Sequence, residues 1–263
     1  MSQSIQANGI NMAYRFDGPE AAPVVMLSNS LMSNHTMWDP QMSVLTEAFR
    51  VLRYDTRGHG ASDAPPGPYT IQLLAEDAVA LLDALGIDKV HFAGLSMGGM
   101  IGQFLGAHYP ERISSLLLCD TASEMPTLEM WNDRISTAQS QGITGLLDGT
   151  LKRWFTAPFL TNDKAAVEKV AEMIRTTGVQ GYVGCASAVR DMSQTAILSR
   201  ITAPTIIIVG EADPACTVEQ SRVLEAHIDG AQLVILGQAS HLSNIEQTEA
   251  FNAAMMTFLK AQL

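Results

Sequence analysis

The stretch VHFAGLSMGG, residues 90–99, leads from apolar residues into a serine that is flanked by glycines, and MIGQFLGAHYP follows it directly. Glycine is used where a backbone must turn tightly or approach another group closely, at a cost of about 0.5–1 kcal/mol inside a regular element. The glycines at 94, 98 and 99 therefore indicate a backbone constraint around Ser96.

Three glycine-rich motifs could explain this spacing. A phosphate-binding loop requires lysine where Met100 stands, and a dinucleotide-binding turn requires glycine where Ser96 stands. The remaining motif is G-x-S-x-G, which Gly94 to Gly98 matches. In that motif a strand turns sharply into a helix and exposes the serine hydroxyl above a sheet. We therefore predict that Ser96 is a nucleophile.

Length and composition indicate a soluble globular protein with one large α/β domain that carries an insertion. The chain has 263 residues, of which 47% are hydrophobic and 16% are charged. No apolar run approaches the roughly 18 residues of a membrane span. The N-terminal MSQSIQANG also lacks the basic and then apolar pattern of a secretory signal. We expect a cytoplasmic protein without a membrane partner.

Charge and cysteine content restrict the partners further. The formal net charge of −11 argues against binding to nucleic acid, because that affinity comes from cations that displace counterions from phosphates. It does not exclude an anionic small substrate, since screening acts over about 8 Å at physiological ionic strength. Cys119, Cys185 and Cys216 form no close pair and no metal-type spacing, which predicts free thiols. We expect neither a metal ion nor an organic cofactor.

Short β-branched runs alternate with longer amphipathic runs, which is typical of an α/β fold. Asn8-Gly9 predicts a hairpin turn between IQA and INMAYRF. The other predicted strands are VVMLSN, RVLRYD, KVHFAGL, SSLLLCD, TIIIVG and AQLVILG. Several are apolar on both faces, as a covered parallel sheet requires. The pattern predicts a mostly parallel, eight-stranded sheet flanked by helices.

Residues 121–200 interrupt this alternation, because they contain helical patterns but no strong strand. We predict that they form a helical cap, or lid, inserted after the sixth strand, SSLLLCD. Residues 1–120 and 201–263 then form the core domain. Ligands of open α/β folds bind at the carboxyl edge of the sheet, and we expect the cap to lie over that edge.

A serine hydroxyl becomes an effective nucleophile when a base takes its proton and a third group orients that base. In α/β hydrolases, which carry the G-x-S-x-G turn, the acid follows a late strand and the histidine follows the last one. TIIIVGEADPAC places Asp213 and AQLVILGQASHLSNIE places His241 at these points. We predict His241 as the general base and Asp213 as the acid. Asp120, at the end of SSLLLCD, and Glu211 are alternative acids.

The other histidines fit other roles. His91 lies in a predicted strand, His227 in a helical pattern and His108 at a helix end, so we expect them to pack or to lie on the surface. His35 and His59 lie in loops that could line a pocket.

The oxyanion that develops in acyl transfer needs hydrogen-bond donors, each of which lowers the barrier by about 2.7–4 kcal/mol. The residue after the nucleophile gives one donor, the N–H of Met97. The second is expected from the loop after an early strand, VVMLSNSLM, in which Leu31 offers its N–H. The common hydrolase loop has His-Gly where this chain has Asn29-Ser30.

Several motifs together resemble the 3-oxoadipate enol-lactonases of the β-ketoadipate pathway of aromatic catabolism. They are LSNSL, MWDPQM, RVLRYDTRGHGASDAPPGPYT, GLSMGG, SSLLLCDTA with a following W-x-x-R, RWFTAPF and SHLSNIE, which cover nearly the whole chain. The resemblance implies a butenolide substrate with a carboxymethyl arm, whose ring carbonyl Ser96 attacks while His241 takes and returns the proton. Met32 departs from the pattern, since we expect glycine there.

A substrate carboxylate calls for a cation in the pocket, and the planar fork of arginine can bind both oxygens. The predicted cap offers Arg134 beside Trp131 and Arg153 beside Trp154. Arg134 and the two tryptophans are the predicted substrate-binding residues. The alternative is that the arginines lie on the surface and the tryptophans only pack the cap.

Three other functions use the same features. A general carboxylesterase or another lactonase would use the same residues on other esters, and a cofactor-free perhydrolase would use peroxide in place of water. A non-catalytic receptor could also use this fold. The predicted partner is a small lactone or ester, and a homo-oligomer is possible.

Overall fold

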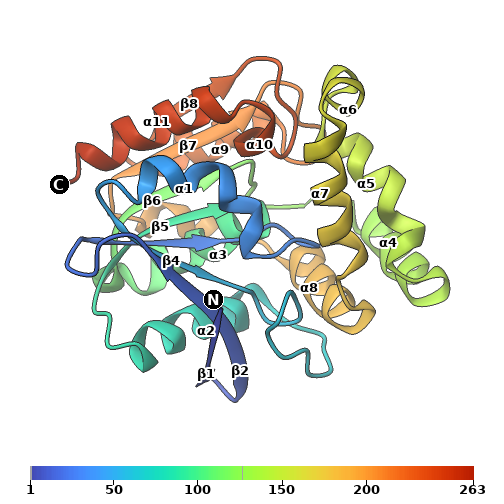
Figure 1. Cartoon of the computed structure of the whole chain (residues 1–263), viewed down its shortest axis with the longest axis horizontal. Coiled ribbons are helices and arrows are strands. Elements are labelled where there is room, and N and C mark those ends of the chain that lie inside the picture. Colours follow the sequence, from blue (N-terminus) through green and yellow to red (C-terminus); the bar gives the residue numbers. More distant parts are fainter. Residues whose placement is uncertain (1, 126) are drawn as a thin grey trace.

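The computed structural model describes residues 2–125 and 127–263, and Figure 1 shows that a central sheet lies between helices. The sheet has eight strands in the order β1-β2-β4-β3-β5-β6-β7-β8. The strands are β1 (Gln3–Ala7), β2 (Ile10–Asp17), β3 (Val24–Ser28), β4 (Arg50–Tyr54), β5 (Val90–Leu95), β6 (Ile113–Cys119), β7 (Thr205–Gly210) and β8 (Gln232–Leu236).

The pairing of these strands confirms the predicted sheet. The pairs β1–β2 and β2–β4 are antiparallel, whereas the pairs from β4 to β8 are parallel. Asn8 and Gly9 both have positive φ, 46° and 77°, as a tight hairpin turn between β1 and β2 requires. β5 and β7 are buried along their whole length, which explains their unbroken apolar sequences.

Helices cover both faces of the sheet (Figure 1). Helices α1 and α11 pack against one another, and α11 contacts β7 and β8, whereas α3 contacts β5 and β6 and also packs on α2. The core helices are α1 (Asp39–Leu45), α2 (Ile71–Ala84), α3 (Met97–His108), α9 (Val218–His227), α10 (Ser243–Glu246) and α11 (Thr248–Lys260). In the part of the chain that the structure describes, no helix is both long and apolar enough to cross a membrane.

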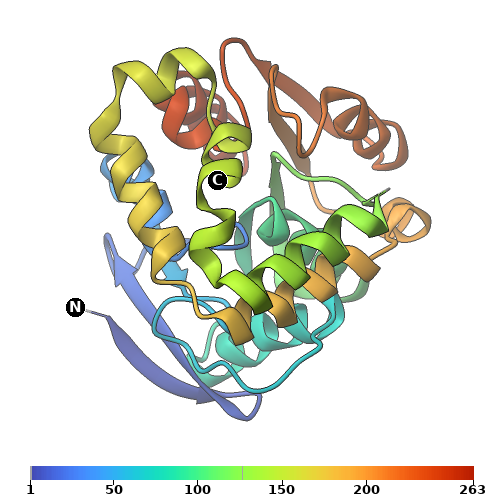
Figure 2. The same ribbon diagram turned by 90° about the vertical axis from the view of Figure 1, so that its right-hand side faces the viewer.

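A set of helices follows the sixth strand, as predicted. Between β6 and β7 the chain forms α4 (Leu128–Gln141), α5 (Leu147–Trp154), α6 (Ala157–Asn162), α7 (Lys164–Arg175) and α8 (Val179–Asp191). Figure 2 shows these yellow-green to orange helices in front of the core. The two ends of the segment are tied together by a β-bridge between Glu124 and Ser193. That residues 121–200 form a separate cap domain stays a prediction.

The turn from β5 into α3 explains the glycines of the opening motif. Ser96 has φ 56° and ψ −116°, between the last residue of β5 and the first residue of α3. A Cβ at Gly94 would lie 2.1 Å from the carbonyl oxygen of Gly98, and a Cβ at Gly98 would lie 2.2 Å from that of Ser28. At Gly99 it would meet the side chain of Thr121 at 2.6 Å. Close backbone approach therefore explains Gly94 and Gly98, as expected, whereas Gly99 makes room for the side chain of Thr121.

The close approach of Gly98 to Ser28 gives a stability prediction. We expect Gly98→Ala to lower the free energy of unfolding by more than about 2 kcal/mol, because neither backbone can move without disturbing the sheet. Gly149→Ala in α5 is the control, since an added Cβ there meets nothing within 4 Å. It should raise stability by up to about 1 kcal/mol. Denaturant titration of both variants measures this, and equal stabilities would contradict the assignment.

Candidate active site

Ser96 lies at the carboxyl end of β5 with its backbone fixed on both sides. Its N–H donates to the carbonyl of Cys119 at 2.9 Å, and its own carbonyl accepts from Oγ1 of Thr121 at 2.8 Å. Ser96 occupies the N-cap position of α3, yet its side chain makes no capping hydrogen bond. The hydroxyl is therefore not engaged by the helix that it precedes, and the residue is half-buried.

His241 and Asp213 form a buried hydrogen-bonded pair. Asp213 follows β7 and His241 follows β8, so both lie at the carboxyl edge where β5 ends. Nδ1 of His241 lies 2.8 Å from Oδ2 of Asp213, and the two side chains are 3% and 0% exposed. Oδ1 of Asp213 accepts from the N–H groups of Ala215 and Cys216 at 2.7 and 3.0 Å. This arrangement places the proton on Nδ1 and leaves Nε2 free to accept one.

Asp120 makes a different set of contacts from Asp213. Its Oδ1 accepts from the N–H of Gly210 at 2.8 Å, and its Oδ2 accepts from Oγ of Ser243 at 2.5 Å. Complete burial, and then the negative charge of Asp213, raise the pKa of Asp120 well above its ordinary value. The structure brings Asp213 to His241, whereas Asp120 joins the end of β6 to β7 and α10. Glu211 is exposed.

The two predicted oxyanion donors lie on adjacent loops. Met97 is the first residue of α3, so its N–H has no intrahelical acceptor. Leu31 lies in the loop after β3, and its N–H has no acceptor within residues 2–125 and 127–263. The N–H of Gly98 donates to the carbonyl of Asn29 at 3.1 Å, which ties the two loops together. Their role as oxyanion donors stays a prediction.

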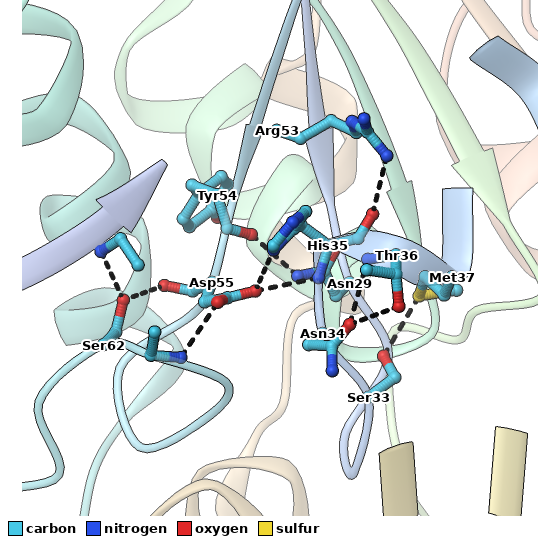
Figure 3. A network of polar contacts seen from close by, with 12 residues as sticks. Asn29, Ser33, Asn34, His35, Thr36, Met37, Arg53, Tyr54, Asp55 and Ser62 are labelled. Atoms are coloured by element: carbon cyan, nitrogen blue, oxygen red, sulfur yellow. Dashed lines mark hydrogen bonds and ion pairs between the residues drawn. The ribbon is translucent and has the colours of Figure 1, made fainter. Parts of the chain in front are cut away.

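Asn29, which stands where the common hydrolase loop has histidine, fixes the start of this loop. Its Nδ2 donates to the carbonyl of Tyr54 at 2.7 Å, and its Oδ1 accepts from Nε1 of Trp38 at 3.1 Å. Figure 3 shows the first of these bonds among other polar contacts that join the segment after β3 to the segment after β4. The sequence did not reveal these partners, because each lies on another element of the fold.

A cavity of about 370 Å³ is lined by most of the predicted residues, although Asp213 and Met97 are not among the described residues of its lining. Its lining combines Ser96 and His241 with Leu31 from the oxyanion loop and with Arg134, Arg153, Trp131 and Trp154 from the inserted helices. The ring of Trp154 lies 6.2 Å from that of His241, between centroids. The volume suits a small organic substrate.

Arg134 lines the cavity, and the side chains to which it donates hydrogen bonds are neutral. Its Nε donates to Oη of Tyr182 at 3.2 Å, Nη2 donates to Oγ1 of Thr150 at 3.4 Å, and its guanidinium lies 5.5 Å from the ring centroid of Trp131. Burial raises the pKa of Tyr182, so its phenol stays neutral. Among the described residues, Arg134 has no carboxylate partner. Tyr182 and Thr150 were not identified from sequence.

Neither His35 nor His59 is among the described residues that line the cavity. His35 pairs with Asp55, and His59 is buried beneath the loop after β3.

Three side chains at the site lie close enough together to be considered as metal ligands. The ligand atoms of Asp213, Cys216 and His241 lie within 4.8 Å of one another. However, burial raises the pKa of the Cys216 thiol well above its ordinary value, which disfavours the thiolate that binds metals.

Comparisons with known proteins agree with this geometry. Residues 23–248 match the model of the alpha/beta hydrolase fold family. The chain is 37% identical over 257 residues to 3-oxoadipate enol-lactonase 2 of Acinetobacter baylyi, which covers 98% of this chain and 96% of that protein.

Solved structures of similar proteins share the fold of this chain. The enol-lactonase of Burkholderia xenovorans LB400 superposes with a TM-score of 0.96 and 40% identity, covering 98% of this chain and 100% of that one. A hydrolase from Pseudomonas aeruginosa superposes with a TM-score of 0.95 and 41% identity, covering 98% of each chain.

The contrasting contacts of the two aspartates give a test of the predicted acid. Asp213→Asn is expected to reduce kcat about 10⁴-fold with the fold intact, because an amide no longer holds His241 in the reactive tautomer. Asp120→Asn is the matched control and should keep kcat within about 10-fold, since its amide oxygen can still accept from Gly210. Steady-state kinetics and circular dichroism decide the matter. A large loss in Asp120→Asn alone would reverse the assignment.

Proposed function

Because the chain belongs to the α/β-hydrolase family and, within it, to the 3-oxoadipate enol-lactonases, we propose that it opens the ring of 3-oxoadipate enol-lactone through an acyl-enzyme on Ser96. The family makes it a carboxylic ester hydrolase. The observation that supports this substrate best is that one cavity is lined by Ser96, His241 and the charged Arg134.

Ring opening begins with attack of the Ser96 hydroxyl on the lactone carbonyl carbon. Nε2 of His241 takes the hydroxyl proton, and Asp213 stabilises the imidazolium that results. The carbonyl oxygen becomes negatively charged as the tetrahedral intermediate forms. The N–H groups of Leu31 and Met97 donate to that oxygen.

Collapse of the intermediate breaks the bond between the carbonyl carbon and the ring oxygen. The electron pair leaves on that oxygen as an enolate, which is a better leaving group than a simple alkoxide. His241 returns its proton and the enol becomes a ketone, which remains attached to Ser96 as part of the acyl group. Water activated by His241 then attacks the ester and frees the second carboxylate.

Arg134 provides recognition of the carboxymethyl arm in this proposal. Its neutral partners hold the guanidinium without neutralising its charge, so a substrate carboxylate can complete its coordination. Trp131 and Trp154 are buried, 7% and 6% exposed, and form apolar walls beside it.

The proposed reaction can be followed by the ultraviolet absorbance of the enol-lactone. The wild-type protein is expected to remove this absorbance, and Ser96→Ala should lower kcat by about 10⁴-fold or more. A panel of short neutral esters, measured in parallel, shows whether the protein prefers the lactone or simple esters. Higher kcat/KM for the neutral esters than for the lactone would instead identify a general carboxylesterase.

The role of Arg134 predicts a selective effect on acidic substrates. Arg134→Ala should raise KM for the lactone acid about 10- to 100-fold, because a charge-assisted hydrogen-bond pair is lost, with little change for neutral esters. Arg175→Ala is the matched control, since Arg175 is exposed on α7 and pairs with Glu168. An unchanged KM for the acid in Arg134→Ala would exclude the proposed contact.

A further inference from the structure

Met32, directly after the predicted oxyanion donor Leu31, has an unusual backbone conformation. Its φ is 65°, in the left-handed region, although its side chain is fully buried. The N–H of Ser33 donates to the carbonyl of Ser30 at 3.2 Å, so Met32 is the third residue of a tight turn. A positive φ at that position is the mark of a type II turn, which favours glycine. A non-glycine residue persists there only when its surroundings enforce it.

His59 provides the contact that enforces this conformation. The N–H of Met32 donates to Nε2 of His59 at 3.0 Å. Nδ1 of His59 faces the carbonyl of Arg57 at 3.4 Å and Sγ of Cys185 at 3.8 Å. Burial lowers the pKa of His59 to about 4, so the ring is neutral at neutral pH and can accept at Nε2.

The loop that carries His59 is itself fixed to the segment after β3. Oδ2 of Asp55 accepts from the N–H of Ala61 at 2.9 Å, whereas Oδ1 accepts from the N–H and from Nδ1 of His35 at 2.8 and 2.9 Å. The Asp55 carbonyl also accepts from Oγ of Ser62 at 2.6 Å. Figure 3 shows these contacts around Asp55. His59 therefore belongs to a loop that cannot shift independently of residues 29–37.

We propose that His59 is a positioning residue for ester hydrolysis: by accepting from the N–H of Met32, it keeps the turn over residues 30–33 in the form that presents the N–H of Leu31 to the reacting oxygen. The inference rests on the proposed function, because it assumes the oxyanion role of Leu31. Without this acceptor Met32 is free to return to negative φ, and the turn over residues 30–33 no longer keeps its form. Because Leu31 lies inside that turn, its N–H then loses its fixed direction, on which transition-state stabilisation depends.

The test uses His59→Leu, which removes the acceptor, and His59→Gln, which can supply another one. A short neutral ester, p-nitrophenyl acetate, is the substrate, so the result does not depend on lactone recognition. We expect His59→Leu to lower kcat about 10- to 100-fold with less than about a 3-fold change in KM. His59→Gln should retain most of the rate.

Glycine at position 32 separates positioning from a merely structural role. Glycine adopts positive φ without help, so Met32→Gly should restore at least about 5-fold of the kcat that His59→Leu loses. His91→Leu is the matched control, because His91 is also buried and bonds only Ser115 in the described chain, at 2.8 Å. It should leave kcat unchanged.

Two results would overturn the inference: a wild-type kcat in His59→Leu, or a loss that Met32→Gly does not recover in folded protein. If His59→Leu does not fold, His59→Asn takes its place, since its shorter side chain also leaves the Met32 N–H without an acceptor. A wild-type protein that hydrolyses neither ester nor lactone would defeat the proposed function instead. An active wild type with an unaffected His59 variant defeats this inference alone.

Discussion

The left-handed backbone of Ser96 is the constraint on which the site depends. A non-glycine residue in such a conformation costs about 1–3 kcal/mol and persists only where neighbouring contacts fix it. Here three contacts come from the ends of two strands: the carbonyl of Asn29 after β3, the carbonyl of Cys119 at the end of β6, and Thr121 just beyond it. The contact from the loop after β3 serves both the turn and the site, because that loop also carries Leu31, the proposed oxyanion donor.

Two buried carboxylates near one another have different surroundings, and this separates their roles. Asp213 accepts two backbone N–H bonds and faces His241, so its negative charge is well supported. Asp120 is fully buried close to that charge, which raises its pKa and favours the protonated form. One charged carboxylate beside the imidazole is what orientation of His241 requires, and a second charge there would be costly. Asp120 instead joins β6, β7 and α10 through Gly210 and Ser243.

The sequence predicts those features that depend on neighbouring residues. The hairpin at Asn8-Gly9, the strands, the inserted helices and the turn at Ser96 each follow from local pattern, and the order of Asp213 and His241 along the chain follows from the strands that precede them. It does not reveal contacts between distant elements. Tyr182 under Arg134 lies 48 positions away, and His59 lies 27 positions from Met32. The residue types in these two pairs and their spacing along the chain do not predict the contacts, because only the fold brings the partners together.

The same distinction applies to charge. The net charge of −11 argues on average against an anionic ligand, yet charges farther than about 8 Å are screened by physiological salt. Within the cavity, a carboxylate about 4 Å from Arg134 would gain roughly 4 kcal/mol at an effective dielectric constant of 20. That gain survives only because Tyr182 and Thr150 hold the guanidinium without cancelling its charge. In the proposed function, preference for an acidic substrate is thus set by Arg134 and its neutral supports, against the charge of the chain as a whole.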